Sequence, residues 1–232
     1  MRKSLLAWAG VAAPVVWLGG ALVISHAQRG FMDRLGWDVW PSGLALGPYG
    51  WGQILVFLVF AVLYIAFATY AVSCATWSGL ARWGSRVVLL GAVITPLLAF
   101  RTDPPNSDVT WHGALHAVGY VALVSSMLVA FIALYPGLIR RAKGRWRWAP
   151  LPLALIPFAW LAPNAEVTGN YLFFAVPFTV FAALALVLRE GTRAQETSAA
   201  VGSGSGGQRT GHRRLRDVHR QTPATHMGKP KQ

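Results

Sequence analysis

Apolar residues occur in long uninterrupted blocks along the chain, without the short alternation of a soluble fold. Six apolar runs, separated by short polar segments, cover residues 5–27, 53–77, 87–100, 112–135, 149–163 and 170–188. A membrane-spanning helix needs about 20 mainly apolar residues. The runs at 87–100 and 149–163 are the shortest, and the others are close to that length. The pattern predicts an all-α polytopic membrane protein, with residues 1–190 forming a bundle of six transmembrane helices.

Composition supports a membrane protein. Of the 232 residues, 54% are hydrophobic and 12% are charged, whereas about 25% are charged in a typical soluble domain. These values argue against a water-soluble enzyme. The single cysteine, Cys74, excludes a disulfide framework and a cysteine-rich metal centre. Residues 191–232 are polar and basic, with a Gly/Ser-rich stretch at 203–207, so we expect a disordered tail.

The first apolar run has two interpretations. Arg2 and Lys3 precede it, and the segment 25–27 (Ser-His-Ala) resembles a signal-peptidase site. The apolar part of a signal peptide is about 7–15 residues long. The run at 5–27 is longer, so we expect an uncleaved transmembrane helix.

Basic residues indicate the orientation. With six spans, one side of the membrane collects the basic residues at 2, 3, 82, 86, 140–147 and 189, and the other collects only Arg29, Arg34 and Arg101. Basic loops stay in the cytoplasm, which predicts a plasma-membrane protein with both termini cytoplasmic. The most basic loop can contact anionic lipid through Arg140, Arg141, Lys143, Arg145 and Arg147. We expect no specific nucleic-acid binding, because these residues lie against the bilayer.

Two histidines are the main candidates for chemistry. His112 and His116 are four residues apart at the start of the fourth run, behind Asp108 or Thr110 as N-cap. This spacing places both imidazoles on one helix face. Together with Asp103 they could hold a divalent metal such as zinc, and a metal-bound water could support hydrolysis at the membrane surface. Asp108, His26 and Glu166 are further candidate ligands, and a haem between His26 and His116 is another alternative.

The same residues have a simpler structural interpretation. Interfacial histidines can bond to loop carbonyl groups or cap a helix, and Asp103 before two prolines is typical of a rigid turn. As a binding site, Arg101, Asp103, His112 and His116 would contact a small ligand or a lipid headgroup. The predicted spans contain no Asp, Glu, Lys or Arg, which argues against a charge-coupled transporter.

Three functions stay open at this point. The leading one is an integral membrane protein that binds a small or lipid-headgroup ligand at an outer-face polar cluster. The others are a membrane-embedded metal-dependent hydrolase that uses His112 and His116, and a non-catalytic accessory protein. The sequence does not decide whether the protein is an enzyme.

Three motifs resemble a known family. They are Leu-Gly-Pro-Tyr-Gly-Trp at 46–51, Phe-Arg-Thr-Asp-Pro-Pro at 100–105 and Trp-His-Gly-x-Leu-His at 111–116. In this order they resemble the bacterial and archaeal membrane proteins of domain of unknown function 998, over about residues 5–190. The resemblance implies a six-helix integral membrane protein, and it implies no activity. Asp103, His112 and His116 match the polar signature of that family.

Overall fold

The computed structural model describes residues 2–31, 41–73, 79–104, 107–134, 182, 184–190 and 197–198. The chain divides into two units, Met1–Thr192 and Arg193–Gln232. In the second unit the described residues are Thr197 and Ser198, both helical. The predicted span at 149–163, the basic loop at 140–147 and most of the predicted disordered tail lie outside the described residues.

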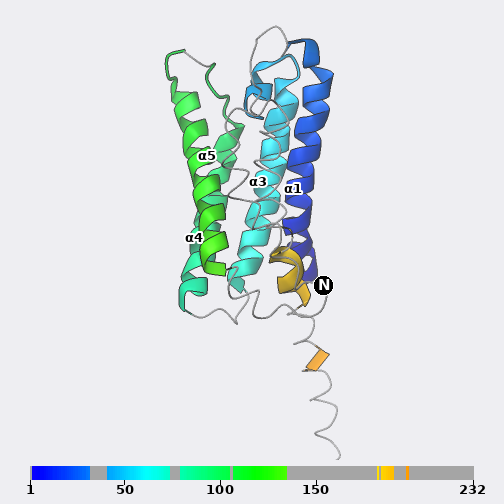
Figure 1. The fold of residues 1–232 in the computed structure, drawn as a ribbon, viewed down its shortest axis with the longest axis vertical. Helices are drawn as coiled ribbons and strands as arrows, with labels where there is room; N and C mark the ends of the chain where they lie inside the picture. Colours follow the sequence, from blue (N-terminus) through cyan, green and yellow to red (C-terminus); the bar gives the residue numbers. More distant parts are fainter. Residues whose placement is uncertain are drawn as a thin grey trace, which may run out of the picture. The chain divides into compact units, whose positions relative to one another are not determined.

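Four long helices stand side by side in the first unit (Figure 1). They are α1 (Arg2–Ala27), α3 (Gly50–Ser73), α4 (Gly79–Ile94) and α5 (Trp111–Val129). A π-helical turn, η3 (Ala130–Leu134), continues α5. Every regular element among the described residues is helical, and four spans are long and apolar enough to cross a membrane: Leu5–Ala27, Gly50–Ser73, Gly79–Ala99 and Trp111–Leu134.

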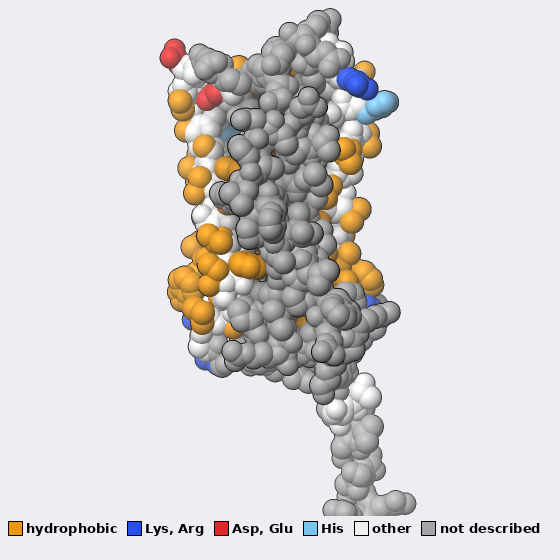
Figure 2. Space-filling view, viewed as in Figure 1, with side chains coloured by type: hydrophobic (Ala, Val, Ile, Leu, Met, Phe, Trp, Pro, Cys, Tyr) orange, Lys and Arg blue, Asp and Glu red, His pale blue; other side chains and the backbone are white. Residues whose placement is uncertain are grey.

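The surface has the character of a membrane protein. Large apolar side chains are exposed on the outward faces of all four helices, among them Val15, Leu55, Val62, Leu90 and Val121. In Figure 2, hydrophobic side chains follow the length of the bundle and the charged ones lie at its two ends. This arrangement fits contact with lipid, because a bilayer exposes the middle of the helices to hydrocarbon.

Helix α3 supplies the centre of the core. Phe57, Phe60, Tyr64, Phe67 and Tyr70 lie on its buried side, each at most 2% exposed. Spacings of three and four residues bring these rings onto one broad face of the helix. Helix α3 packs against α1, α4 and η2, and its buried face reaches α5 through the contacts of Phe57 with His116 and of Tyr64 with Ser126.

Small residues let the helices approach closely. A Cβ atom on Gly91 of α4 would collide with the side chain of Ser126 on α5, and one on Gly119 would collide with the backbone at Leu98. Ser126 in turn bonds to the hydroxyl of Tyr64 on α3, at 2.8 Å between oxygens. Small residues and interhelical hydrogen bonds are the usual means of helix association in lipid, where burial of apolar surface gives no net gain.

The third span differs from its prediction. The sequence predicts a span over 87–100, with Arg82 and Arg86 in the polar segment before it, but α4 begins at Gly79 and contains both arginines. Gly79 has a positive φ of 51°, which lets the chain turn immediately before the helix. The arginines can then lie in the first two turns, because their long side chains reach the polar region.

The third span changes its helix type at Thr95 and Pro96. From Thr95 to Ala99 the α-helix tightens into the 3₁₀ helix η2, since proline cannot donate a backbone hydrogen bond. The hydroxyl of Thr95 donates to the carbonyl of Gly91, one turn earlier, at 2.8 Å. The tightened turn directs Leu98 and Phe100 toward the start of α5.

Candidate functional site

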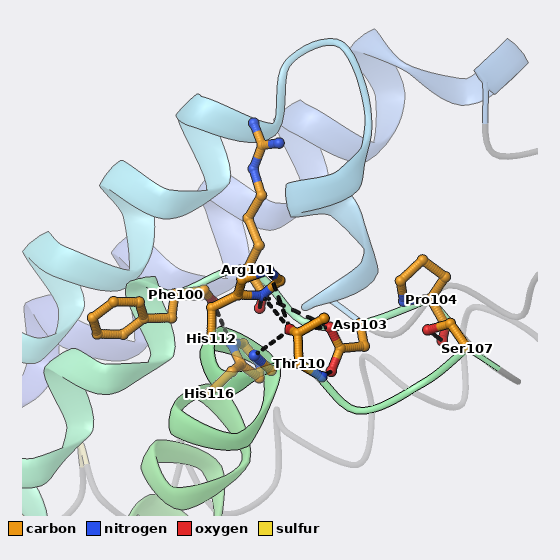
Figure 3. A network of polar contacts seen from close by, with 9 residues as sticks. Phe100, Arg101, Asp103, Pro104, Ser107, Thr110, His112 and His116 are labelled. Carbon is orange, nitrogen blue, oxygen red and sulfur yellow. Dashed lines mark hydrogen bonds and ion pairs between the residues drawn. The ribbon is translucent and has the colours of Figure 1, made fainter.

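The candidate residues meet where η2 leads into α5. The connection has non-helical backbone at Arg101–Pro104 and Ser107–Thr110, so its carbonyl and amide groups need partners from outside a helix. Figure 3 shows how the side chains of Asp103, Thr110, His112 and His116 supply them. The sequence analysis names three of these four as candidate site residues, and it names Thr110 as a candidate N-cap.

Thr110 is the centre of the network. Its hydroxyl accepts from the amide of Gly113 at 3.2 Å, the N-cap arrangement expected at a helix start. The same hydroxyl donates to Oδ1 of Asp103 at 2.6 Å, and the Thr110 amide donates to Oδ2 at 2.9 Å. Both carboxylate oxygens are therefore engaged inside the protein.

These bonds favour the charged form of Asp103. The hydrogen bonds from the hydroxyl and the amide of Thr110 hold the pKa of the Asp103 carboxyl below its usual range, with smaller contributions from His112 and His116. The carboxylate also lies at the N-terminus of α5, which has no acidic residue in its own first turn. A negative charge at that position is favourable to the helix dipole.

Gly113 makes room for this carboxylate. A Cβ atom on Gly113 would collide with Asp103 Oδ2. The glycine between the two histidine positions is therefore part of the site, although its role was not recognised in the sequence. The sequence did contain an indication of this role: in the motif at 111–113, a glycine lies in the first turn of a predicted helix.

His112 belongs to the same network. Its Nδ1 lies 2.8 Å from the Thr110 hydroxyl, with Nε2 at 3.1 Å, and Nδ1 is 3.2 Å from the carbonyl oxygen of Arg101. Because that carbonyl can only accept and the Thr110 hydrogen is given to Asp103, we assign the His112 proton to Nδ1. The Asp103 carboxylate is 3.7 Å from the same nitrogen.

His116 makes separate contacts deeper in the bundle. Its Nδ1 lies 2.7 Å from the carbonyl oxygen of Phe100 and 3.0 Å from that of Leu98. Both neighbours are acceptors, so Nδ1 carries the proton. The ring packs edge-on against Phe57 of α3, with 5.9 Å between centroids. His116 therefore joins the end of η2 to both α3 and α5.

Arg101 takes part through its backbone only. Its carbonyl accepts from His112, while its exposed side chain extends away from the Asp103 carboxylate (Figure 3). Among the described residues, no ion pair joins its guanidinium to a carboxylate. The structure thus separates Arg101 from the other three candidates: Asp103, His112 and His116 support the loop, and the Arg101 charge faces outward.

The metal hypothesis gains no support from this geometry. Across the parts of the chain that the structure describes, no group of three His, Cys, Asp or Glu residues could hold a metal ion. The Nδ1 atoms of both histidines serve as donors to oxygen, and Asp103 is bound to Thr110. Of the other candidate ligands, His26 and Asp108 are exposed, and Glu166 lies outside the described residues.

Comparison with protein-family models, with curated proteins and with solved structures finds no match for this chain. The resemblance to domain of unknown function 998 therefore stays a hypothesis that depends on the three motifs. The structure gives these motifs physical roles. Asp103, Thr110 and Gly113 form one capping unit, and the motif at 46–51 is held by Gln28, whose side chain bonds to the Leu44 carbonyl at 2.9 Å and the Tyr49 amide at 3.3 Å.

Proposed function

We propose that this chain is a six-helix plasma-membrane protein that binds the phosphate of an anionic lipid headgroup through Arg101. In this proposal both termini are cytoplasmic, and the start of α5 lies at the outer face. The network of Asp103, Thr110 and His112 holds the backbone from which Arg101 projects. The proposal assigns no reaction to the protein.

The observation that carries the proposal is the outward-facing guanidinium of Arg101. The nearest acid along the chain, Asp103, is already occupied by Thr110, which leaves the Arg101 charge available to an external anion. Arginine offers several N–H donors in a plane, and these fit a phosphate group. The His112 bond to the Arg101 carbonyl fixes the start of this side chain, which reduces the entropy lost on binding.

Exposed aromatic residues support the proposal that this end of the bundle lies at headgroup depth. Trp111 is 69% exposed at the first residue of α5, and Tyr49 and Trp51 are 48% and 67% exposed around the start of α3. The two helices run in the same direction, since Phe57 contacts His116 and Tyr64 contacts Ser126 further along. Trp and Tyr collect at the membrane–water interface, where lipid phosphates lie.

The proposal can be tested with a probe beside Arg101. Trp111 packs edge-on against Phe100, with 5.7 Å between ring centroids, so its indole N–H resonance reports on this loop. The protein is placed in phosphatidylcholine nanodiscs and titrated with short-chain phosphatidylglycerol. We expect a saturable shift of the Trp111 resonance that is lost in Arg101→Gln.

Arg86→Gln is the matched control, because Arg86 is an exposed arginine two turns into α4, toward the opposite end of the bundle. It should keep the Trp111 response. A shift of the same size and midpoint in Arg101→Gln would contradict the proposal.

A further inference from the structure

An arginine stacked on a tryptophan lies beside the start of α1. The described residues 184–190 are helical and include Arg189 near their end, and in Figure 1 this short helix lies next to the first turns of α1. The guanidinium carbon Cζ of Arg189 is 4.6 Å from the centroid of the Trp8 ring. Such a cation–π contact uses the face of the guanidinium group, so the N–H donors at its edge remain available to a planar partner.

Two glycine contacts show which end of the bundle this is. A Cβ atom on Gly20 of α1 would collide with Val56 of α3, and a Cβ atom on Gly10 would collide with Phe67. Positions that increase along α3 thus meet positions that decrease along α1, so the two helices are antiparallel. Because α3 and α5 run in the same direction, the start of α1 lies at the end of the bundle away from Arg101.

No acidic group in the described parts of the chain balances the charge of Arg189. Its Nε is buried without a hydrogen-bond partner, while the residue as a whole is partly exposed. No ion pair joins it to a described carboxylate, and Glu190, the next residue, does not share its helix face, because adjacent positions on a helix point in different directions. A desolvated donor of a charged group without an acceptor is unfavourable. An anion at the terminal Nη atoms would offset this cost.

Exposed apolar side chains beside Arg189 indicate what carries the anion. Trp8 is 44% exposed, and Leu5, one helical turn earlier, is also exposed. Residues three positions apart lie on the same helix face, and both belong to the first turns of the span Leu5–Ala27. A free anion in water would leave these side chains uncovered, whereas the glycerol and acyl part of a lipid would cover them. The phosphate of the same lipid fits the edge of a guanidinium group.

We propose that Arg189, stacked on Trp8, binds the phosphate of an anionic phospholipid in the leaflet at the start of α1. The stacking orders the arginine side chain before the lipid arrives, which reduces the entropy lost on binding. In the proposed orientation this leaflet is the cytoplasmic one, which carries anionic lipids. The site is separate from that of Arg101, and its binding does not require the contact at the outer face.

The test follows the indole N–H resonance of Trp8, identified by its absence in Trp8→Phe. The full-length protein in phosphatidylcholine nanodiscs is titrated with short-chain phosphatidylglycerol, and we expect a saturable shift of this resonance. Arg189→Gln should weaken the binding that Trp8 reports by at least about tenfold, the effect of losing a charge-assisted hydrogen bond. The same variant should keep the response of Trp111. Unchanged affinity at Trp8 in Arg189→Gln would overturn the proposal.

Arg86→Gln is the matched control, because it removes the same charge from the same end of the bundle. Arg86 is exposed, and the contact of Gly91 on α4 with Ser126 on α5, together with that of Gly84 with Ala133, shows that α4 starts where α5 ends. The Trp8 response should stay as in the wild type. An equal loss of affinity in both variants would show that the lipid responds only to the total positive charge of this end, and would contradict a site at Arg189.

Two measurements need only the wild type, so the test stands even if Arg189→Gln does not fold. Inorganic phosphate, at the concentrations at which the lipid saturates the protein, should leave the Trp8 resonance in place. An equal response to inorganic phosphate would assign the site to a free anion, and a Trp8 resonance that does not respond to the lipid would overturn the proposal. A Trp8 response without a Trp111 response would contradict only the function proposed for Arg101.

Discussion

Asp103 accepts two hydrogen bonds from Thr110, one from the hydroxyl at 2.6 Å and one from the backbone amide at 2.9 Å. The pair closes the loop between η2 and α5, and it aligns the first turn of α5 with His112 and His116. The candidate site is built on this pair, so the stability of the loop should depend on both partners.

Replacing Thr110 tests this dependence directly. Thr110→Ala removes the hydroxyl bond to Asp103 and the N-cap to Gly113 together and keeps the backbone amide bond, and we expect a loss of about 1–2 kcal/mol of stability. Thr110→Ser retains the hydroxyl, so its unfolding temperature should be close to that of the wild type. Thermal unfolding of the detergent-purified protein measures the difference. Equal midpoints for the alanine and serine variants would show that the hydroxyl is not needed.

The charge of Asp103 should make the loop sensitive to acid. Because the folded pKa is lowered, the ionised carboxylate contributes its full stabilisation above the unfolded value of about 3.9. That contribution is lost as the pH falls through the lowered folded value. The amide resonance of Thr110, followed by NMR from pH 6 downward, should therefore titrate with a midpoint below about 3.9. A midpoint at or above that value would contradict the two-bond arrangement, and Asp103→Asn should remove the titration.

Gly113 should not tolerate even a methyl group. In Gly113→Ala the new Cβ would occupy the position of the Asp103 carboxylate, so the loop must move and the protein should lose stability. Gly19→Ala is the control, because a Cβ there meets nothing within 4 Å. It should be neutral or stabilising by up to about 1 kcal/mol, the difference in helix propensity. Thermal midpoints that fall equally in both variants would contradict the role given to Gly113.

The proposed orientation can be checked with single cysteines. Cys74 is first replaced by serine. Ser107→Cys then lies in the exposed loop before α5, and Leu80→Cys lies in the first turn of α4, at the end of the bundle away from that loop. We expect a membrane-impermeant maleimide to label Ser107→Cys on intact cells, and to label Leu80→Cys only after the membrane is opened. The reverse pattern would place the polar network in the cytoplasm.

The sequence predicts the long helices well, because a run of apolar residues long enough to cross a membrane has few other solutions. It also identifies Thr110 as a candidate N-cap. It misplaces the start of α4, since Arg82 and Arg86 resemble a polar turn when the chain is read residue by residue. In the structure, both lie near a helix end.

The site is harder to predict, because its partners are largely backbone groups. His112 and His116 bond to the carbonyl groups of Leu98, Phe100 and Arg101, and a carbonyl group has no sequence signature. The spacing of the two histidines suggested shared ligation of a metal, whereas the fold gives them different partners.

The most direct test of the central claim observes Arg101 itself. The Nε–H resonance of Arg101, identified by its absence in Arg101→Lys, is recorded while short-chain phosphatidylglycerol is added to the protein in phosphatidylcholine nanodiscs. The account predicts a saturable downfield shift, as expected for an N–H that donates to phosphate, and no saturable shift for Arg86. An Arg101 resonance that does not move at lipid concentrations that saturate other resonances would contradict headgroup binding by this residue.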